Sequence, residues 1–490
     1  MKNNFKSILA ILAIATFFSC NDEFLDKTPT EFINIDETTK SAALNDKVTA
    51  GTLNGIYSMM VNTGTGGTSS HEDFGQRGYD LMNDFLSGDI ALSRNTYSRY
   101  ADFANLLSTV DYSNNDNYMP WRYYYRIIRS ANLVIEASGG NTVTPETDNL
   151  KFTLGQAKAL RAYAYFYMSQ MYAVEYNASL ELLPIYKTPT EPTQPQSTMS
   201  DLYTFMIEDL NSAISLLSGF NRPTKTNINA DVAKGLLAYV HASKGDDASN
   251  QLAKDLAEEV IASGYALTTY EETTGGFNDI NTPSWIWGFD VTLANGLDLV
   301  SWWGQMDYFT YSYNSFGDYK SIDKGLYDMI PADDVRKTQF RDGNPGFGWW
   351  KFYNGARVFR GQRNIEDDYI YMRTEEMYLL SAEMSAKGAG TDADAQGRLA
   401  EILANRYEDA SDYSDLISKT GDDLLNEIIL QTRIELWGEG KSYLSMKRNK
   451  QMMTRGSNHT FKAGLSIPYS DERLTYEIPR AEIQNNPFIN

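Results

Sequence analysis

Apolar residues recur every three or four positions along several stretches of the chain, and one long stretch between them lacks that period. In the first stretch Leu53, Ile56, Tyr57 and Met60 fall on one face of a helix. An apolar stripe with this period is typical of an amphipathic helix that packs on a core. The pattern predicts helices over residues 47–61, 118–137, 154–172, 199–217 and 422–448.

A short pattern occurs twice, as LLAYVHASKG at residues 236–245 and as LLSAEMSAKG at residues 379–388. Each copy is followed by a polar linker, and Leu-Ala-Glu then appears at the same offset, at residues 256–258 and 399–401. Each copy therefore reads as a helix, a Lys-Gly stop, a loop and a second helix. This is a helical hairpin of the tetratricopeptide kind, whose unit is about 34 residues. We predict a mainly α fold in which such hairpins form an α-α superhelix.

Residues 275–370, between the two copies, have poor helical periodicity, frequent Gly and six of the eight Trp residues. The run PSWIWGFDVT predicts a short strand, and the alternation along it places Trp285 and Trp287 on one face, which we expect to be buried. We predict a loop-rich insert with short strands, mounted on a helical scaffold made of residues 46–274 and 371–490. Scaffold and insert form a single domain, and loops on a rigid scaffold commonly carry binding surfaces.

The N-terminus has the anatomy of a secretory signal peptide. Lys2 and Lys6 precede an apolar run at residues 8–18. That run is shorter than the roughly 20 residues that span a bilayer, and it has the length of a signal core. We predict that residues 1–19 are a signal peptide.

Cys20 is the only cysteine of the chain and directly follows the predicted signal. A cysteine at that place is typical of a lipoprotein, so we predict that Cys20 is lipidated and that residues 20–45 form a polar leash. More than one lipid chain gives stable membrane anchoring. A Leu usually stands three residues before such a cysteine, where this chain has Phe17. A secretory signal that is cut elsewhere is therefore the alternative.

Charge and composition exclude several classes of function. The chain has 64 acidic and 43 basic residues, for a net charge of −21, which opposes binding to nucleic acid. A single cysteine and three scattered histidines do not predict a zinc site. The chain has no Gly-x-Ser-x-Gly motif of a hydrolase. We predict no metal, no cofactor and no catalytic residues.

Aromatic residues make up 13% of the chain, with 33 Tyr, and this content calls for an explanation. They are concentrated in the insert. Exposed rings stack on the apolar C–H faces of sugars, and neighbouring polar groups bind the hydroxyls. We predict Trp302 and Trp303 as stacking platforms, with Tyr308, Tyr311 and Tyr313 beside them. The alternative for each ring is a place in the core, where most Trp side chains lie.

A set of motifs runs along the whole chain in a recognisable order. It begins with CNDEFLDKTPT at Cys20 and continues through the helix at residues 125–135 and GQAKALRAYAYFYMSQMY at residues 155–172. MSDLYTFMIEDLNSAISLL, MRTEEMYLLSAEMSAKG, the run from Arg433 to Arg448 and the closing Ile-Pro, Glu-Ile and Asn-Pro pairs follow. In these motifs the chain resembles the SusD-like (RagB/SusD) family of outer-membrane nutrient-binding lipoproteins.

The resemblance implies a largely helical fold with tetratricopeptide-like hairpins, and it implies no catalysis. It implies a partner, a SusC-like TonB-dependent barrel in the outer membrane, over which the lipoprotein closes as a lid. The acidic residues that follow Cys20 resemble a signal that sends lipoproteins to the cell surface, so the expected place is the outer membrane, facing the exterior. The family often uses the early loop for its ligand, which adds Asp89, Arg94, Asn95 and Tyr97 to the candidate binding residues.

Three functions are consistent with the sequence. The first is capture of oligosaccharides or polysaccharide and their delivery to the transporter. The second is capture of peptides or another nutrient on the same scaffold. The third is a surface glycoside hydrolase, which needs two carboxylates about 5–10 Å apart across a cleft.

Overall fold

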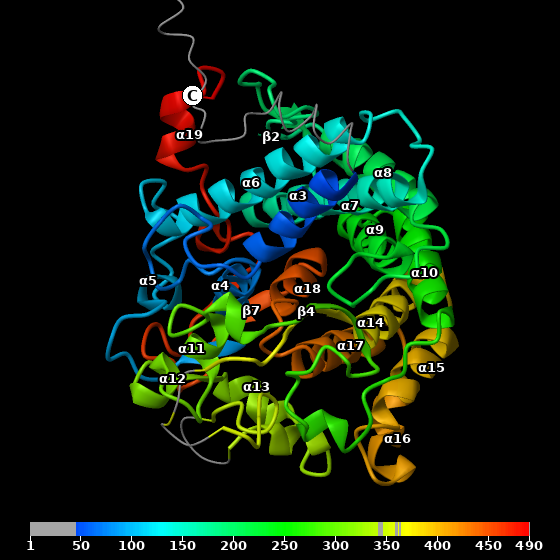
Figure 1. Ribbon diagram of the computed structural model, residues 1–490. Helices are drawn as coiled ribbons and strands as arrows, with labels where there is room; N and C mark the ends of the chain where they lie inside the picture. The colour runs from blue at the N-terminus through cyan, green and yellow to red at the C-terminus, as the bar shows by residue number, and fades with distance from the viewer. Residues whose placement is uncertain (1–45, 342–345, 358–360, 362–363, 490) are drawn as a thin grey trace, which may run out of the picture.

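The structure, a computed structural model, describes residues 46–341, 346–357, 361 and 364–489 (Figure 1). The predicted signal peptide, Cys20 and the predicted leash lie outside the described residues. Within the described part of the chain, no helix is both long enough and apolar enough to cross a membrane.

Six helices form most of the first half of the scaffold, and those from α6 to α10 pack side by side in chain order. The pairs α6–α7, α7–α8, α8–α9 and α9–α10 are all in contact, and α3 lies against α6 and α7 (Figure 1). Their bounds are α3 (Asp46–Met59), α6 (Asn115–Ala137), α7 (Asp148–Tyr172), α8 (Met199–Leu216), α9 (Ala230–Lys244) and α10 (Asp247–Ala262). The helices predicted in this half of the scaffold are confirmed, and their apolar stripes pack against one another.

The two copies of the repeated pattern are helical hairpins, as predicted. The first is α9 with α10, and the second is α14 (Thr374–Met384), the π-turn η6 (Ser385–Ala389) and α15 (Asp392–Leu403). Gly245 and Gly388 end the first helix of each hairpin with φ angles of 76° and 96°, which glycine adopts without steric cost. Helix α10 packs on α14, so the hairpins are neighbours in space although the insert separates them in sequence.

The C-terminal helical stretch is broken, which corrects the prediction of continuous helix over residues 422–448. The chain forms α17 (Gly421–Glu435), a turn, and α18 (Ser442–Arg448). Gly438 and Gly440 both have a φ near 75° in this turn. A Cβ atom on Gly440 would stand 2.5 Å from Cβ of Asp80. Glycine is needed here because another buried helix lies against the turn.

That helix is α4 (Gln76–Ser87), which sequence periodicity did not predict and in which every residue is buried. Its polar side chains face the α17–α18 turn: Arg77 Nη2 donates to the Gly438 carbonyl (2.8 Å), and Asp84 Oδ2 accepts from Gly440 N–H (3.0 Å). No apolar period marks α4 in the sequence, because several of its buried positions carry polar side chains. Hydrogen-bond partners in the turn satisfy these buried polar groups.

The described strands pair as four short antiparallel two-stranded sheets: β1 (Ile90–Leu92) with β5 (Lys320–Ile322), β2 (Glu181–Leu183) with β3 (Ser197–Thr198), β4 (Trp285–Phe289) with β6 (Tyr369–Arg373), and β7 (Met452–Thr454) with β8 (Ser466–Pro468). Strand β4 and the burial of Trp285 and Trp287 are confirmed, at 0% and 1% exposure. Tyr163 of α7 and Tyr371 of β6 contact the Trp287 ring. The 285–289 strand thus joins the insert to the helical core.

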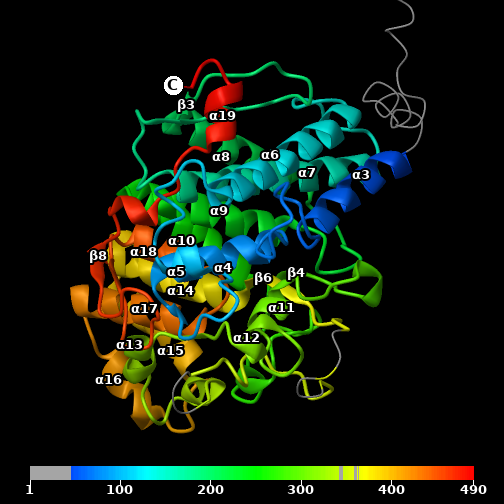
Figure 2. The same cartoon turned by 90° about the vertical axis from the view of Figure 1, so that its left-hand side faces the viewer.

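Short helices complete the insert and the periphery. They are α5 (Ala101–Ala104), η3 (Glu272–Thr274), η4 (Leu293–Asn295), α11 (Trp302–Met306), α12 (Tyr313–Phe316), α13 (Lys324–Met329), η5 (Val335–Gln339), η7 (Ala410–Tyr413), α16 (Ser414–Ile417), η8 (Glu472–Leu474) and α19 (Arg480–Asn485). Figures 1 and 2 both place α11, α12 and α13 in the half of the molecule that lies away from α6 and α19.

A buried network of four positive and four negative side chains joins the insert to the scaffold. Glu435 on α17 is central: its carboxylate contacts the guanidinium groups of Arg336 (3.1 Å), Arg373 (2.7 Å) and Arg406 (2.7 Å). The other members are Lys351, Asp334, Glu375 and Glu439, each within 3.3 Å of a group of opposite charge. Buried charges are stable only when paired in this way.

Candidate functional site

The pairing of β1 with β5 brings the early loop and the insert together. Ile90, Ala91 and Leu92 lie opposite Ile322, Ser321 and Lys320. The pairing continues beyond the strands, since Tyr319 N–H donates to the Arg94 carbonyl (3.0 Å). Segments more than 200 residues apart in sequence are therefore held side by side.

Asp318 holds the early loop in place. Its buried carboxylate accepts backbone N–H bonds from Thr96 (2.7 Å), Tyr97 (2.7 Å) and Arg99 (3.0 Å). Three such bonds fix the direction in which the side chains of Tyr97 and Arg99 leave the loop. The insert thus positions the residues of another segment.

We expect Asp318→Ala to weaken ligand binding at this surface about tenfold while the protein stays folded, because loss of the three bonds frees the loop. The measurement is ligand affinity, together with hydrogen exchange of residues 94–100, which should become faster. Asp298→Ala, on an exposed insert loop, is the control. Unchanged exchange in residues 94–100 would contradict the role of Asp318.

The first aromatic cluster consists of His71, Tyr97, Arg99 and Tyr313. The Tyr313 ring lies 5.7 Å from His71 and 5.8 Å from Tyr97, and the Arg99 guanidinium lies 5.1 Å from its centroid. Tyr97 is 49% exposed. The cluster joins three segments of the chain, and in it Tyr313 contacts both the exposed Tyr97 ring and the Arg99 guanidinium.

His71 and Tyr313 form a neutral hydrogen-bonded pair. Burial, followed by the positive charge of Arg99, lowers the pKa of His71, and burial raises the pKa of Tyr313. At neutral pH the imidazole is therefore uncharged and the phenol is protonated. The Tyr313 hydroxyl and Nδ1 of His71 are 2.6 Å apart and share a hydrogen bond. The Arg99 guanidinium, which contacts the Tyr313 ring, also lies 3.6 Å from the Glu72 carboxylate.

The second aromatic cluster consists of Tyr308, Arg341, Trp349, Trp350 and Tyr353. Arg341 donates to the Tyr308 hydroxyl (3.0 Å) and lies 5.2 Å from the centroid of the half-buried Trp349. Trp350 is 40% exposed and packs on Tyr353, with centroids 4.7 Å apart. Tyr319 and Phe347 lie between the two clusters, since Tyr319 packs on Phe347 and Phe347 packs on Tyr308.

Trp302 and Trp303 do not offer stacking faces, contrary to the sequence-based prediction. They are only 2% and 1% exposed. The Arg77 guanidinium covers Trp302 at 4.6 Å, and the Arg357 guanidinium lies 4.8 Å from the centroid of Trp303. Trp303 Nε1 donates to the Asp367 carbonyl (2.8 Å). Both rings belong to the core, because helix α11 turns inward against the scaffold.

Asp89 is also structural in this arrangement. It is 1% exposed and bound to Arg433 (2.6 Å), and its carbonyl accepts the indole N–H of Trp437 (2.9 Å). Its carboxylate is therefore not presented to a ligand, which corrects that prediction.

The remaining predicted residues lie near the surface. Arg94 is exposed and its guanidinium lies 5.4 Å from the Tyr319 centroid. Asn95 is half-buried, and Tyr311, 39% exposed, packs on Phe316 with centroids 4.4 Å apart. Together with Tyr97, Tyr308 and Tyr313, these side chains belong to the loop and the insert that the β1–β5 sheet joins.

Sequence reasoning missed His71, Arg99, Arg341, Trp350 and Tyr353. His71 follows a Gly/Thr/Ser loop, where no pattern pointed to the insert. Arg99 could have been found, because it lies two residues after Tyr97 and before an aromatic residue. Trp350 was identified in the insert, but the exposure of either member of a Trp-Trp pair depends on tertiary packing.

The chemistry of this surface is that of recognition. Two carboxylates contact residues of the first cluster. Glu72 is paired with Arg99, and Asp318 accepts backbone N–H groups of the early loop. Among the described residues, no group of three or more His, Cys, Asp or Glu side chains could hold a metal ion. Exposed rings with adjacent guanidinium and hydroxyl groups suit a polyhydroxylated ligand with apolar faces.

Comparisons with known proteins agree with this architecture. A SusD-like carbohydrate-binding protein from Bacteroides vulgatus superposes with a TM-score of 0.76 at 23% identity, over 91% of this chain and 97% of that chain. Surface glycan-binding protein A from Bacteroides thetaiotaomicron, solved with laminarihexaose, superposes with a TM-score of 0.67 at 16% identity, over 90% and 98%. The mainly helical SusD-like fold is therefore confirmed.

Sequence comparisons lead to the same family. A SusD-like protein from Bacteroides ovatus is 23% identical over 487 residues, which cover 90% of this chain and 82% of that protein. Residues 23–241 match a family model described as "Starch-binding associating with outer membrane", and residues 307–488 match the model of the SusD family. The chain belongs to the SusD/RagB family of non-catalytic, outer-membrane-associated binding proteins.

Proposed function

We propose that this protein captures oligosaccharides at the cell surface and passes them to a TonB-dependent outer-membrane barrel, to which it is held close by a lipid anchor on Cys20. The observation that carries the proposal is the first aromatic cluster. It places an exposed Tyr97 ring beside Tyr313 and Arg99 on a surface assembled from three segments. Laminarihexaose is bound by a relative of the same fold, which supports a saccharide ligand.

The ligand-binding surface in this proposal is centred on Tyr97, Arg99 and Tyr313, and it extends past Tyr319 towards Trp350. The Tyr97 ring stacks on a sugar face, and the Arg99 guanidinium and the Tyr313–His71 pair bind hydroxyl groups. Tyr308, Tyr311, Arg94 and Asn95 border the surface. A chain of several sugar units could then contact both aromatic clusters, which suits an oligosaccharide better than a single sugar.

The delivery step and the anchor rest on the family and on the N-terminal sequence. The description of the matched model associates the family with the outer membrane. An outer-membrane barrel is the route by which a captured oligosaccharide could enter the cell. A lipidated Cys20 would keep the binding protein at the mouth of that barrel.

The test is affinity electrophoresis of residues 21–490 through gels that contain one polysaccharide each, with β-glucans and α-glucans in the panel. We expect one glycan class to retard the wild type, and we expect the Tyr97→Ala, Tyr313→Ala double variant to bind it at least about tenfold more weakly, because stacking and polar contacts are both lost. Tyr112→Ala is the matched control, since Tyr112 is 47% exposed outside the cluster.

Retardation that persists in the double variant would place the glycan site elsewhere. If no glycan retards the wild type and a peptide mixture binds to it, the ligand is a peptide and the saccharide proposal fails. Release of reducing sugar from any retarding glycan would instead support the hydrolase alternative.

A further inference from the structure

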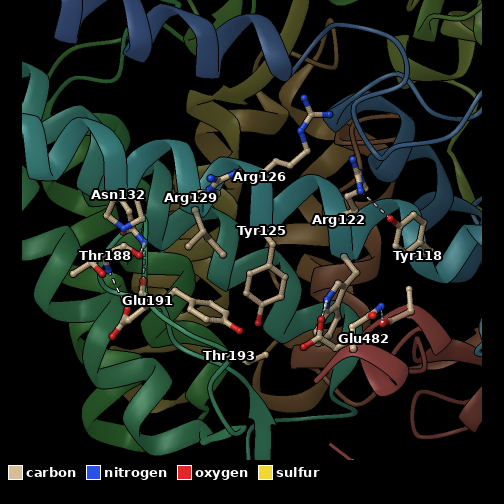
Figure 3. Close-up of a pocket in the computed structure, with 16 residues that line it drawn as sticks. Tyr118, Arg122, Tyr125, Arg126, Arg129, Asn132, Thr188, Glu191, Thr193 and Glu482 are labelled. Atoms are coloured by element: carbon tan, nitrogen blue, oxygen red, sulfur yellow. Dashed lines mark hydrogen bonds between the residues drawn. The ribbon is translucent and has the colours of Figure 1, made fainter. Parts of the chain in front are cut away.

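A groove of about 620 Å³ lies between α6, the connection at residues 184–196 and α19 (Figure 3). It shares no residue with the two aromatic clusters, and Figures 1 and 2 both place α6 and α19 in the half of the molecule away from α12. Its volume is in the range of small-ligand sites. Nothing in the proposed function uses this groove.

The floor of the groove is a stripe along α6. Tyr118, Arg122, Tyr125, Arg129 and Asn132 line it at spacings of three and four, so they share one helix face. A face turned towards other elements usually carries aliphatic side chains. Here it carries rings, guanidinium groups and an amide, which are groups that bind a ligand.

Hydrogen bonds preform the walls of the groove. The Tyr125 hydroxyl donates to the Pro184 carbonyl (3.0 Å), and Asn132 Nδ2 donates to the Tyr186 carbonyl (3.0 Å). On the other side, Trp121 Nε1 donates to Glu482 Oε2 (3.2 Å), which attaches α19 to α6. The Tyr125 ring is 5.8 Å from the Tyr186 ring, so two half-buried aromatic residues stand together in the groove. A preformed site loses little conformational entropy when a ligand binds.

Among the described side chains that line the groove, one guanidinium group has no hydrogen-bond or ion-pair partner. Arg122 donates to the Tyr118 hydroxyl (3.0 Å) and Arg126 donates to the Thr65 carbonyl (2.7 Å). The Arg129 side chain is exposed, and its guanidinium group has no hydrogen bond or ion pair with any described residue. None of the three arginine residues that line the groove has an ion pair with a described carboxylate, so their positive charge is available to an acidic ligand.

The two carboxylates that line the groove are occupied. Glu191 accepts the backbone N–H groups of Lys187 (2.5 Å) and Thr188 (3.0 Å). Glu482 accepts the Trp121 indole and the Asn486 amide (2.9 Å). In the view of Figure 3 they lie on either side of Tyr125, with the arginine residues along α6. The lining side chains carry three positive and two negative charges, and the positive charges share one wall.

We propose that this groove is a second saccharide site, which binds an oligosaccharide that contains a uronic acid. The carboxylate of the uronic acid pairs with the Arg129 guanidinium in a bidentate, charge-assisted contact. Tyr125 and Tyr186 contact the apolar face of the sugar ring, and Thr193 and Asn485 on the rim bind hydroxyl groups. The inference rests on the proposed function only for the class of ligand, since its residues are all distinct from the first aromatic cluster.

The probe is trigalacturonate, with its fully methyl-esterified form as the uncharged match. Both are titrated by calorimetry into the wild type and into the Tyr97→Ala, Tyr313→Ala double variant, which lacks the first site. We expect trigalacturonate to bind both proteins equally, and the methyl ester to bind at least about tenfold more weakly, because charge-assisted hydrogen bonds are the stronger class. Hydrogen exchange should slow in residues 184–196 when trigalacturonate is present.

Arg129→Gln should reduce the affinity for trigalacturonate at least about tenfold, because it removes the guanidinium and keeps a side chain of similar length. Lys462→Gln is the control, since it removes one positive charge from an exposed position outside the groove and outside both aromatic clusters. The inference is overturned if Arg129→Gln binds like wild type, if residues 184–196 are not protected, or if an acidic peptide protects them and trigalacturonate does not. Binding that is lost only in the Tyr97→Ala, Tyr313→Ala variant would leave the proposed function standing and remove the second site. If trigalacturonate binds at the groove but no glycan binds at the first cluster, the second site stands and the proposed function fails.

Discussion

Replacing Trp302 and Trp303 together by alanine is expected to lower the free energy of unfolding by about 5 kcal/mol or more, because a buried Trp replaced by Ala typically costs about 3–5 kcal/mol. The two rings contact each other, with centroids 4.7 Å apart, and Phe352 lies 4.6 Å from Trp302. Their loss would leave a cavity and two buried guanidinium groups, of Arg77 and Arg357, without the rings they lie against. Since the rings touch, the two effects need not add.

The measurement is the urea midpoint of unfolding, followed by tryptophan fluorescence and circular dichroism. Trp350→Ala is the matched control, because Trp350 is 40% exposed, and it should change the free energy of unfolding by less than about 1 kcal/mol. A double variant with wild-type stability and no glycan binding would mean that Trp302 and Trp303 contact the ligand after all. The structure predicts the opposite result: any loss of binding accompanies a loss of fold.

Glu435→Gln is expected to lower the free energy of unfolding by about 3–5 kcal/mol, the usual cost of removing one partner from a buried ion pair. Burial raises the pKa of Glu435, but the positive charges of Arg406 and Arg373 outweigh it and hold that pKa well below its ordinary value. The carboxylate is therefore ionised, and it compensates three buried guanidinium groups that the amide of Gln cannot compensate. Because Arg336 belongs to the insert and Glu435 to α17, we expect the insert to separate from the scaffold first.

Urea unfolding measures the stability of this variant, and limited proteolysis shows which part opens. Glu477→Gln makes the same chemical change at an exposed position and should leave the midpoint within the error of the wild type. Cleavage that begins within residues 275–370 is the expected pattern. Equal stability of Glu435→Gln and wild type would show that the network does not hold the insert in place.

Most of the helical scaffold could be predicted from local patterns. The stripe Leu53, Ile56, Tyr57 and Met60 is buried along α3, as its spacing requires. The Lys-Gly stops predicted after residues 244 and 387 coincide with glycines at positive φ. These features are local, since a helix period and a glycine turn depend on a few adjacent residues.

The failures share one physical cause, which is that burial of polar groups is decided by partners distant in the sequence. Helix α4 was missed because Arg77, Asp80 and Asp84 look solvent-exposed in sequence, yet they face the α17–α18 turn. Asp89 was assigned to the ligand because the family resemblance implies that the early loop binds it. In the structure the Asp89 carboxylate is buried in an ion pair with Arg433, which lies more than 300 residues away in the sequence.

The sequence by itself determined the fold class, the stacked hairpins, the loop-rich insert and the family, because periodicity, glycine stops and an ordered set of motifs can be read along the chain. Only the tertiary structure decided which aromatic rings face solvent. Trp302 and Trp350 lie in the same insert, each in a Trp-Trp pair, yet one is 2% exposed and the other 40%. The reason is that exposure depends on what packs above a ring: Arg77 of α4 covers Trp302, and the ring contacts of Trp350 are with its neighbours Trp349 and Tyr353.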